Sequence, residues 1–193
     1  LSAAILRECG RRGYTGVVLD FEEPPRQDRQ LFVQQLEQSL SASRRCLYVP
    51  ETYIRAAPGA LMLLCTALSG GNFVQRLQEA AEQRGGAGHL ALDIQRLRMD
   101  FQLPAPSGEG TPLSQEALDT LMATESPSVF FSQDLCARYF TYTRNGETHF
   151  VLYDDADTLS QKLRTGASLG FPAAFFAFPE VRDLLPRLFP RRR

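Results

Sequence analysis

Short apolar runs typical of β-strands alternate along this chain with segments whose apolar residues recur at helical spacing. The strand-like runs 16–22, 45–49 and 60–67 are accompanied by helical patterns over 28–41 and 72–83. Several of these runs are apolar at nearly every position, as expected of strands buried on both faces of a parallel sheet. The alternation therefore predicts an α/β fold in which helices cover a parallel sheet, either doubly wound or closed into a barrel.

A barrel fits the sequence better than a nucleotide-binding sheet. Ser69-Gly70-Gly71 lacks the Gly-x-Gly-x-x-Gly spacing of a phosphate loop, which disfavours nucleotide binding. A complete (β/α)8 TIM barrel needs about 250 residues. The chain has 193 residues, in which we count about five barrel-type strands. We therefore expect a single domain over residues 1–193 that forms part of a TIM-type barrel.

A hairpin interrupts the alternation in the last third of the chain. Asn145-Gly146 joins two β-rich runs at 138–143 and 148–153, and Asn-Gly in this position is the strongest short-range hairpin signal. A helical pattern over 156–169 and an apolar strand over 173–178 follow. The sequence thus predicts a β-hairpin insertion before the last βα unit.

Composition and charge disfavour several classes of function. Lys and Arg number 21 and Asp and Glu 22, so no overall field would attract nucleic acid or an anionic membrane. The longest apolar run, 60–68, is about half as long as a membrane span requires. Four cysteines and two histidines are scattered without paired spacing, so we expect no metal site and no cofactor. The first residue is Leu1 rather than Met, and we expect a piece of a longer product.

Two carboxylates at the end of the first strand-like run are the strongest candidates for chemistry. Strand alternation places Val18, Asp20 and Glu22 on one face, with successive carboxylates about 6.6 Å apart along the strand. Barrel enzymes build their active sites at the carboxyl ends of their strands. Two neighbouring buried carboxyl groups resist ionising together, which raises one pKa toward the range of a general acid. The alternative is a strand end that forms ion pairs with Arg26 or Arg29.

Two stretches resemble glycoside hydrolase family 18, the family of chitinases and spore-germination glycosidases. That family carries Asp-x-x-Asp-x-Asp-x-Glu on its fourth barrel strand, and Gly13-Tyr-Thr-Gly-Val-Val-Leu-Asp-Phe-Glu22 retains the last Asp and the Glu. Val151-Leu-Tyr-Asp-Asp155, after the hairpin, resembles the segment before the family's final helix and eighth strand. The resemblance covers most of the chain. It implies the C-terminal portion of the barrel, about strands 4 to 8.

The resemblance also implies a mechanism and a substrate. In this family the Glu protonates the glycosidic oxygen, and the substrate's own 2-acetamido group attacks the anomeric carbon. Carried over, Glu22 is the acid and Asp20 orients the acetamido group, with no cofactor. The implied substrate is an oligosaccharide or polysaccharide that contains N-acetylglucosamine, such as chitin or peptidoglycan. A secreted or cell-envelope location is implied only by the resemblance.

Further residues are candidates for lining the same cleft. They are Tyr48, Glu51, Tyr53, Asp93 and Asp100 near strand ends, and Phe176 or Phe178 for stacking on a sugar. Each could instead serve packing alone, and Asp154 and Asp155 are expected to cap the helix that follows them.

Departures from the family pattern keep a second function open. Val18 replaces an Asp, 63–67 lacks the family's Tyr and Asp, and the chain has no Trp. The alternative is a catalytically impaired carbohydrate-binding or protein-interaction module. Five strands alone would leave open sheet edges. We therefore expect an N-terminal half outside this sequence, or a second copy, to complete the barrel.

Overall fold

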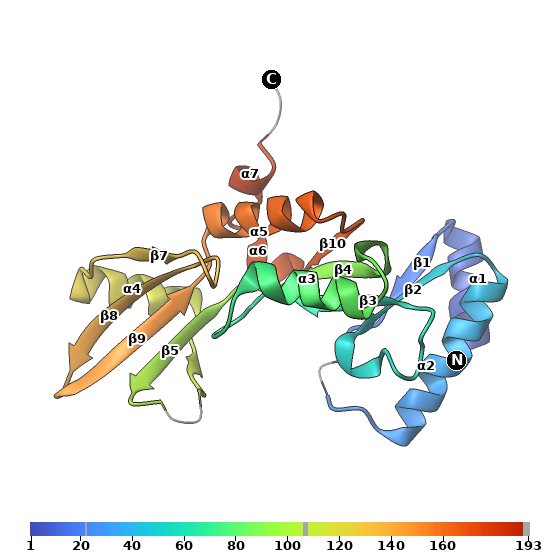
Figure 1. Ribbon diagram of the computed structural model, residues 1–193, viewed down its shortest axis with the longest axis horizontal. Coiled ribbons are helices and arrows are strands. Elements are labelled where there is room, and N and C mark those ends of the chain that lie inside the picture. The colour runs from blue at the N-terminus through green and yellow to red at the C-terminus, as the bar shows by residue number, and fades with distance from the viewer. Residues whose placement is uncertain (22, 106–107, 191–193) are drawn as a thin grey trace.

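The computed structural model describes residues 1–21, 23–105 and 108–190, which fold around two five-stranded sheets. One sheet is parallel and carries helices α1, α2, α3 and α5; the other is antiparallel and lies at the opposite end of the molecule (Figure 1). The parallel sheet provides the strand ends at which a site could form, and the antiparallel sheet stands beside it.

The parallel sheet has the strand order of a partial barrel. Its neighbours are, in order, β1 (Gly16–Val18), β2 (Cys46–Pro50), β3 (Leu61–Cys65), β4 (Leu90–Ile94) and β10 (Ala174–Phe176). Every pair is parallel. The prediction of an α/β fold with part of a (β/α) barrel is confirmed.

Helices connect these strands and cover one face of the sheet. The main ones are α1 (Ser2–Arg12), α2 (Gln27–Ala42), α3 (Phe73–Gln83) and α5 (Ala156–Ser168), and the short ones are η1 (Glu51–Tyr53), η2 (Ala87–His89), α6 (Phe178–Val181) and α7 (Leu185–Leu188). Asp155 caps α5 as predicted, in a capping box with Thr158. Asn72 caps α3 by accepting a hydrogen bond from the Gln75 backbone.

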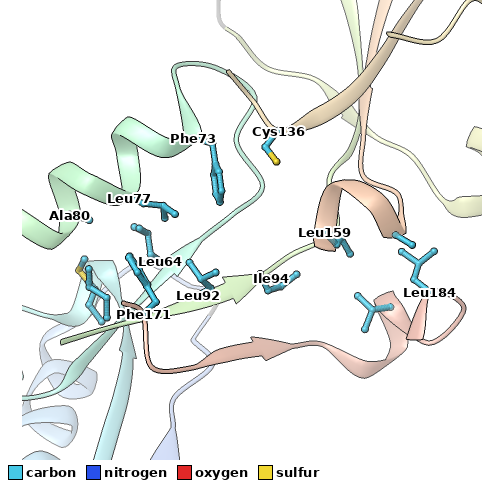
Figure 2. Packing of buried hydrophobic residues seen from close by; sticks show 14 residues of the cluster. Leu64, Phe73, Leu77, Ala80, Leu92, Ile94, Cys136, Leu159, Phe171 and Leu184 are labelled. Carbon is cyan, nitrogen blue, oxygen red and sulfur yellow. The ribbon is translucent and has the colours of Figure 1, made fainter. Parts of the chain in front are cut away.

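The core lies between the outer face of the sheet and these helices (Figure 2). Leu64 and Leu92 are fully or almost fully buried against Phe73 and Leu77 of α3. Helix α5 approaches closely because Gly166 has no side chain: a Cβ there would lie 2.5 Å from Leu92. The alternation of each strand therefore sends one set of side chains to the helices and leaves the other set on the opposite face.

That opposite face is concave. Tyr48 of β2 and Phe175 of β10 are separated by strands β3 and β4, which in a flat sheet would place them roughly 14 Å apart. Their ring centroids are only 4.9 Å apart, at an interplanar angle of 67°. The sheet is therefore curled as in a barrel wall, and the two rings meet across its hollow.

The antiparallel sheet is a larger insertion than the sequence predicts. Its order is β6 (Thr111–Pro112), β5 (Arg98–Leu103), β9 (Glu147–Tyr153), β8 (Ala137–Arg144) and β7 (Phe130–Ser132), and α4 (Gln115–Glu125) packs on one face. The β8–β9 hairpin is confirmed, with Asn145 and Gly146 both at positive φ. Strand β5 is not predicted from the sequence, because only three residues separate it from β4.

A buried ion pair joins the insertion to the parallel sheet. Asp154 follows β9 and accepts hydrogen bonds from Lys162 Nζ at 2.8 Å, from Thr158 Oγ1 at 2.8 Å and from the Leu97 backbone N–H at 3.0 Å. The Asp154 and Lys162 side chains are both 0% exposed. Asp154 was expected to cap α5, but that role belongs to its neighbour alone.

We expect Lys162→Met to destabilise the protein by about 3–5 kcal/mol, since it would leave the Asp154 carboxylate buried without its cation. Urea unfolding measures the loss. The matched control is Arg187→Ala, because Arg187 pairs with Asp157 through side chains that are 63% and 65% exposed. That change should alter stability by less than about 1 kcal/mol. Equal losses in the two variants would contradict this view of the ion pair.

Candidate active site

The concave face of the parallel sheet carries the residues that the helices do not cover. Strand register places Val18 beside Tyr48, Cys65 beside Asp93, and Asp93 beside Phe175. Asp20 lies two residues beyond Val18, on the same side by strand alternation. The backbone N–H of Leu19 still donates to the Tyr48 carbonyl at 2.9 Å, so the β geometry continues toward it. These side chains meet at the carboxyl ends of the strands, where barrel enzymes hold their sites.

Asp20 and Asp93 are close enough to influence each other's charge. Burial raises the pKa of Asp93, and the negative charges of Asp20 and Glu180 raise that pKa further. The hydrogen bond that Gln95 Nε2 donates to the Asp93 carboxylate, at 2.7 Å, opposes this rise in the pKa. Asp93 is therefore a carboxyl group whose protonated form is favoured, in a hollow shared with a second carboxylate.

Cys65 lies beside Asp93 on the concave face. Burial is the largest cause that raises the pKa of its thiol, and the charge of Asp93 adds to the rise. The thiol is therefore held in its neutral form, and thiolate chemistry is disfavoured at this position. Together with Leu63, which is 7% exposed, Cys65 makes the β3 part of the face largely apolar.

Glu22, the predicted acid, lies outside the described residues. Its neighbours on both sides are described. Phe21 packs against Tyr53 with ring centroids 5.1 Å apart, and Glu23 forms an ion pair with Arg29. Arg29 therefore has a carboxylate partner at Glu23, the residue after the candidate acid.

The candidates that follow β2 separate into three environments. Tyr48 lies on the concave face, where its ring meets Phe175. Tyr53 is fully buried, and its hydroxyl donates to the Glu23 carbonyl at 3.4 Å. The carboxylate of Glu51 is bound by the Arg76 guanidinium of α3. Of the three, Tyr48 is the one that the structure brings to the face shared by Asp20 and Asp93.

The aromatic residue that faces the hollow from β10 is Phe175. Phe176 points to the other side, where its ring contacts Phe189 with centroids 6.0 Å apart, and it packs on the main core. Phe178 lies beyond the strand, at the start of α6, and is 59% exposed. Sequence alternation alone did not single out Phe175, because the run 173–178 is apolar on both faces. Only the pairing of Phe175 with Asp93 in the structure shows which face it is on.

Asp100 is in the antiparallel sheet and not at a barrel strand end. It accepts a hydrogen bond from Tyr142 Oη at 2.7 Å, and the Nδ1 of His149 lies 3.1 Å from its carboxylate. The Tyr142 and His149 rings stack with centroids 4.6 Å apart. Burial, followed by the bond to Asp100, raises the pKa of Tyr142 to about 12. This cluster lies apart from Asp20 and Asp93.

A cavity of about 450 Å³ lies between the segments that follow β3 and β4 and the antiparallel sheet. Gln95, which binds Asp93, lines it, as does Ser69 beyond β3. Met99 and Phe101 of β5 form the opposite wall. The side chain of Arg96 is also held here, because it donates to Asp183 at 2.8 Å and to the Glu180 carbonyl at 3.1 Å. Arg98, Glu109 and Glu180 also line the cavity, so its walls combine charged and apolar side chains.

The described residues contain neither a cluster of metal-binding side chains nor a helix that could span a membrane. No group of three or more His, Cys, Asp or Glu side chains in that part of the chain could hold a metal ion. No helix among the same residues combines the length and the hydropathy needed to cross a membrane.

Comparison with known proteins identifies the fold. No protein-family model and no curated protein matches the sequence. Among solved structures, chitinase from Chromobacterium violaceum is 18% identical over 99% of this chain and 71% of its own, with a TM-score of 0.67. The spore cortex-lytic enzyme SleL of Bacillus megaterium is 17% identical over 100% of this chain, TM-score 0.64, and a class V chitinase mutant from Nicotiana tobaccum in complex with NAG4 is 11% identical over 98%, TM-score 0.65.

The fold is that of chitinase-like glycosidases. The chain spans only part of these structures: 53% of SleL and 72% of the tobacco chitinase chain. At these identities the likeness concerns the arrangement of strands and helices.

We expect Asp93→Asn to stabilise the protein at neutral pH and to have little effect in acid. The pKa of Asp93 is raised in the folded state, so folding takes up a proton there and stability falls as the pH rises from about 4 through the higher folded pKa. The variant has no carboxyl group at this position, so its stability does not fall with pH for this reason. Urea unfolding midpoints of parent and variant, measured from acid to neutral pH, test the prediction. A difference between the two midpoints that does not increase with pH would contradict the prediction.

Proposed function

We propose that this chain is the C-terminal part of a family 18-type glycosidase that acts on a glycan containing N-acetylglucosamine. The observation that carries the proposal is the meeting of Asp20, Asp93 and the Tyr48–Phe175 pair on the concave side of a curled parallel sheet. The chitinase-like fold supports it. So does the Asp-x-Glu pattern at residues 20–22, which follows β1 in the sequence.

The proposed roles are those that the resemblance to family 18 implies. Glu22 protonates the glycosidic oxygen, and Asp20 orients the 2-acetamido group that attacks the anomeric carbon. Asp93 is the residue placed to support Asp20, since the negative charge of Asp20 contributes to the raised pKa of Asp93. Tyr48 and Phe175 offer apolar ring surface under the sugar. The NAG4 complex of the tobacco chitinase mutant supports the class of ligand.

One observation favours the second candidate, a module that binds glycan without cleaving it. The concave face presents Val18 from β1 and Leu63 and Cys65 from β3, and none of these can hydrogen-bond an acetamido carbonyl well. Weaker binding of the acetamido group would lower the rate of cleavage more than it would lower the affinity for the glycan.

Completion of the barrel is part of the proposal. Strands β1 and β10 each have one strand partner among the described residues, so both edges of the parallel sheet are open there. The unpaired backbone groups of an open sheet edge are normally covered by another strand, a helix or a loop. We propose that further chain, outside this sequence, adds the remaining strands, in keeping with the 71% of the Chromobacterium chitinase that this chain covers. A second copy is the alternative.

Glu22→Gln tests the proposed acid. In the full-length protein we expect cleavage of an N-acetylglucosamine tetramer to fall by about 10²–10⁴-fold, because the amide cannot donate a proton to the leaving oxygen. Binding of the tetramer, followed by calorimetry, should stay within about twofold. Glu23→Gln is the matched control: it is the next residue, and its carboxylate is already bound by Arg29. That variant should cleave like the parent.

The outcomes separate the candidates. Cleavage by the parent and by Glu23→Gln, with binding alone by Glu22→Gln, supports the glycosidase. Binding without cleavage in all three proteins supports the non-catalytic module. A folded parent that does not bind the tetramer overturns both.

A further inference from the structure

Five arginines gather where helix α1 ends and strand β2 begins. Two of them are in the last turn of α1, one is a turn earlier, and two directly precede β2. We call Arg7, Arg11, Arg12, Arg44 and Arg45 the arginine cluster. Helix α1 and the start of β2 lie at the end of the molecule opposite the antiparallel sheet (Figure 1).

Contacts between α1 and the residue before β2 bring the arginines together. Arg45 Nε donates a hydrogen bond to the Tyr14 carbonyl at 3.1 Å. The Arg45 guanidinium also reaches Gly10, because a Cβ built on that glycine would lie 4.0 Å from Arg45 Nη2. Gly10 comes three positions after Arg7, and residues at this spacing are neighbours on a helix surface. The guanidinium of Arg45 therefore lies over the same part of α1 that carries Arg7.

The arginine cluster has more positive than negative charge. Its nearby carboxylate is Glu8, which forms ion pairs with both Arg11 and Arg12. The hydrogen bond from Arg11, followed by that from Arg12, lowers the pKa of the Glu8 carboxyl group. Within the part of the chain that the structure describes, the other three arginines have no ion-pair partner. The helix dipole favours cations in the last turn of α1, but it does not account for those three.

Arg44 occupies a backbone conformation that does not favour an arginine. Its φ is 54°, in the left-handed region, where glycine and asparagine cost less than residues with long side chains. Its side chain is exposed in the turn between α2 and β2. The fold would therefore be more stable with a different residue here, which favours a role for the Arg44 guanidinium in contacts outside the fold.

The arginine cluster lies away from the proposed active site. Tyr14 comes just before β1 and Arg45 just before β2, so both are at the amino ends of parallel strands. Asp20 and Asp93 lie toward the carboxyl ends. Arg45 is also on the β2 side of β1, whereas the open edge of β1 is on its other side. A partner bound to the cluster would leave the proposed site accessible.

We propose that the arginine cluster binds a polymer that carries phosphate groups along a polyol or sugar backbone. The inference does not depend on the proposed function. One bidentate guanidinium fills a planar carboxylate, whereas the tetrahedral oxygens of a phosphate can accept from guanidinium groups of two elements, as Arg7 and Arg45 offer. A lipid surface also takes up apolar side chains. Residues 7–14 and 43–46 include no exposed Leu, Ile, Val or Phe, which favours the polymer.

The first measurement is the affinity of the full-length protein for poly(glycerol phosphate) at increasing salt concentration. We expect the affinity to fall by about 50-fold between about 50 and about 200 mM salt, as for about four phosphate contacts that release counterions. Neutral dextran and poly(glutamate) of similar length should bind at least about tenfold more weakly.

Arg7→Gln and Arg44→Asn test the residues. Each removes a guanidinium that has no ion-pair partner among the described residues, and we expect each to weaken binding by about three- to tenfold and to reduce the salt dependence. Asparagine tolerates the left-handed conformation, so Arg44→Asn should unfold at the same urea concentration as the parent or at a higher one. Its weaker binding then cannot come from a damaged fold.

Arg187→Gln is the matched control. It changes the net charge by the same amount, and the Arg187 side chain is 63% exposed on α7, compared with 65% for Arg11. It should bind like the parent. Equal weakening in all three variants would show that affinity follows net charge, and would overturn the proposal.

The choice of partner is tested in parallel. Tighter binding of poly(glutamate), of single-stranded DNA or of vesicles with anionic lipid than of poly(glycerol phosphate) overturns the proposed polymer. A folded parent that does not bind poly(glycerol phosphate) overturns it as well. Neither result bears on the proposed active site, since cleavage and binding of the N-acetylglucosamine tetramer are measured separately.

Discussion

The attachment of the antiparallel sheet depends on the buried pair of Asp154 and Lys162. The aspartate ends β9, the lysine lies two turns into α5, and the Leu97 backbone N–H at the start of β5 donates to the same carboxylate. Lys162 also lies over the Phe73 ring of α3, 5.9 Å from its centroid. One carboxylate thereby connects the start and the end of the insertion with two helices of the parallel sheet. Because neither charge reaches water, each depends on the other, and the geometry of the junction is strongly determined.

That junction sets where the cleft can lie. Cavity walls come from Gln95 on the side of the parallel sheet and from Phe101 on the side of the antiparallel sheet, and the two segments meet at Leu97. Gln95, which binds Asp93, is on the first wall, and Met99 and Phe101 form the second. The separation of the two walls is therefore set by the junction at Asp154, which does not itself line the cavity.

The sequence predicts the parallel sheet well because each of its strands carries its own signal. Periodicity is local, so 45–49 and 60–67 could be assigned without knowledge of their partners. Side-chain direction at β10 could not, because every residue of 173–178 is apolar and only the pairing with β4 shows that Phe175 faces Asp93. Tyr53 was grouped with Tyr48 by proximity in sequence, but η1 turns it into the core. Strand β5 could not be separated from β4, because the three residues between them include no Gly, Pro, Asn, Asp or Ser to mark a turn.

The ends of the insertion meet each other. The Asp154 backbone N–H donates to the Leu97 carbonyl at 2.8 Å, and the Leu97 N–H returns to the Asp154 side chain. A segment of more than fifty residues thus leaves and rejoins the parallel sheet at a single point. Loops of this kind tolerate change in length because their closure entropy grows slowly with the number of residues. The insertion that forms one wall of the cleft can therefore change in length and surface during evolution. Such changes would leave the βα units that carry the carboxylates unaltered.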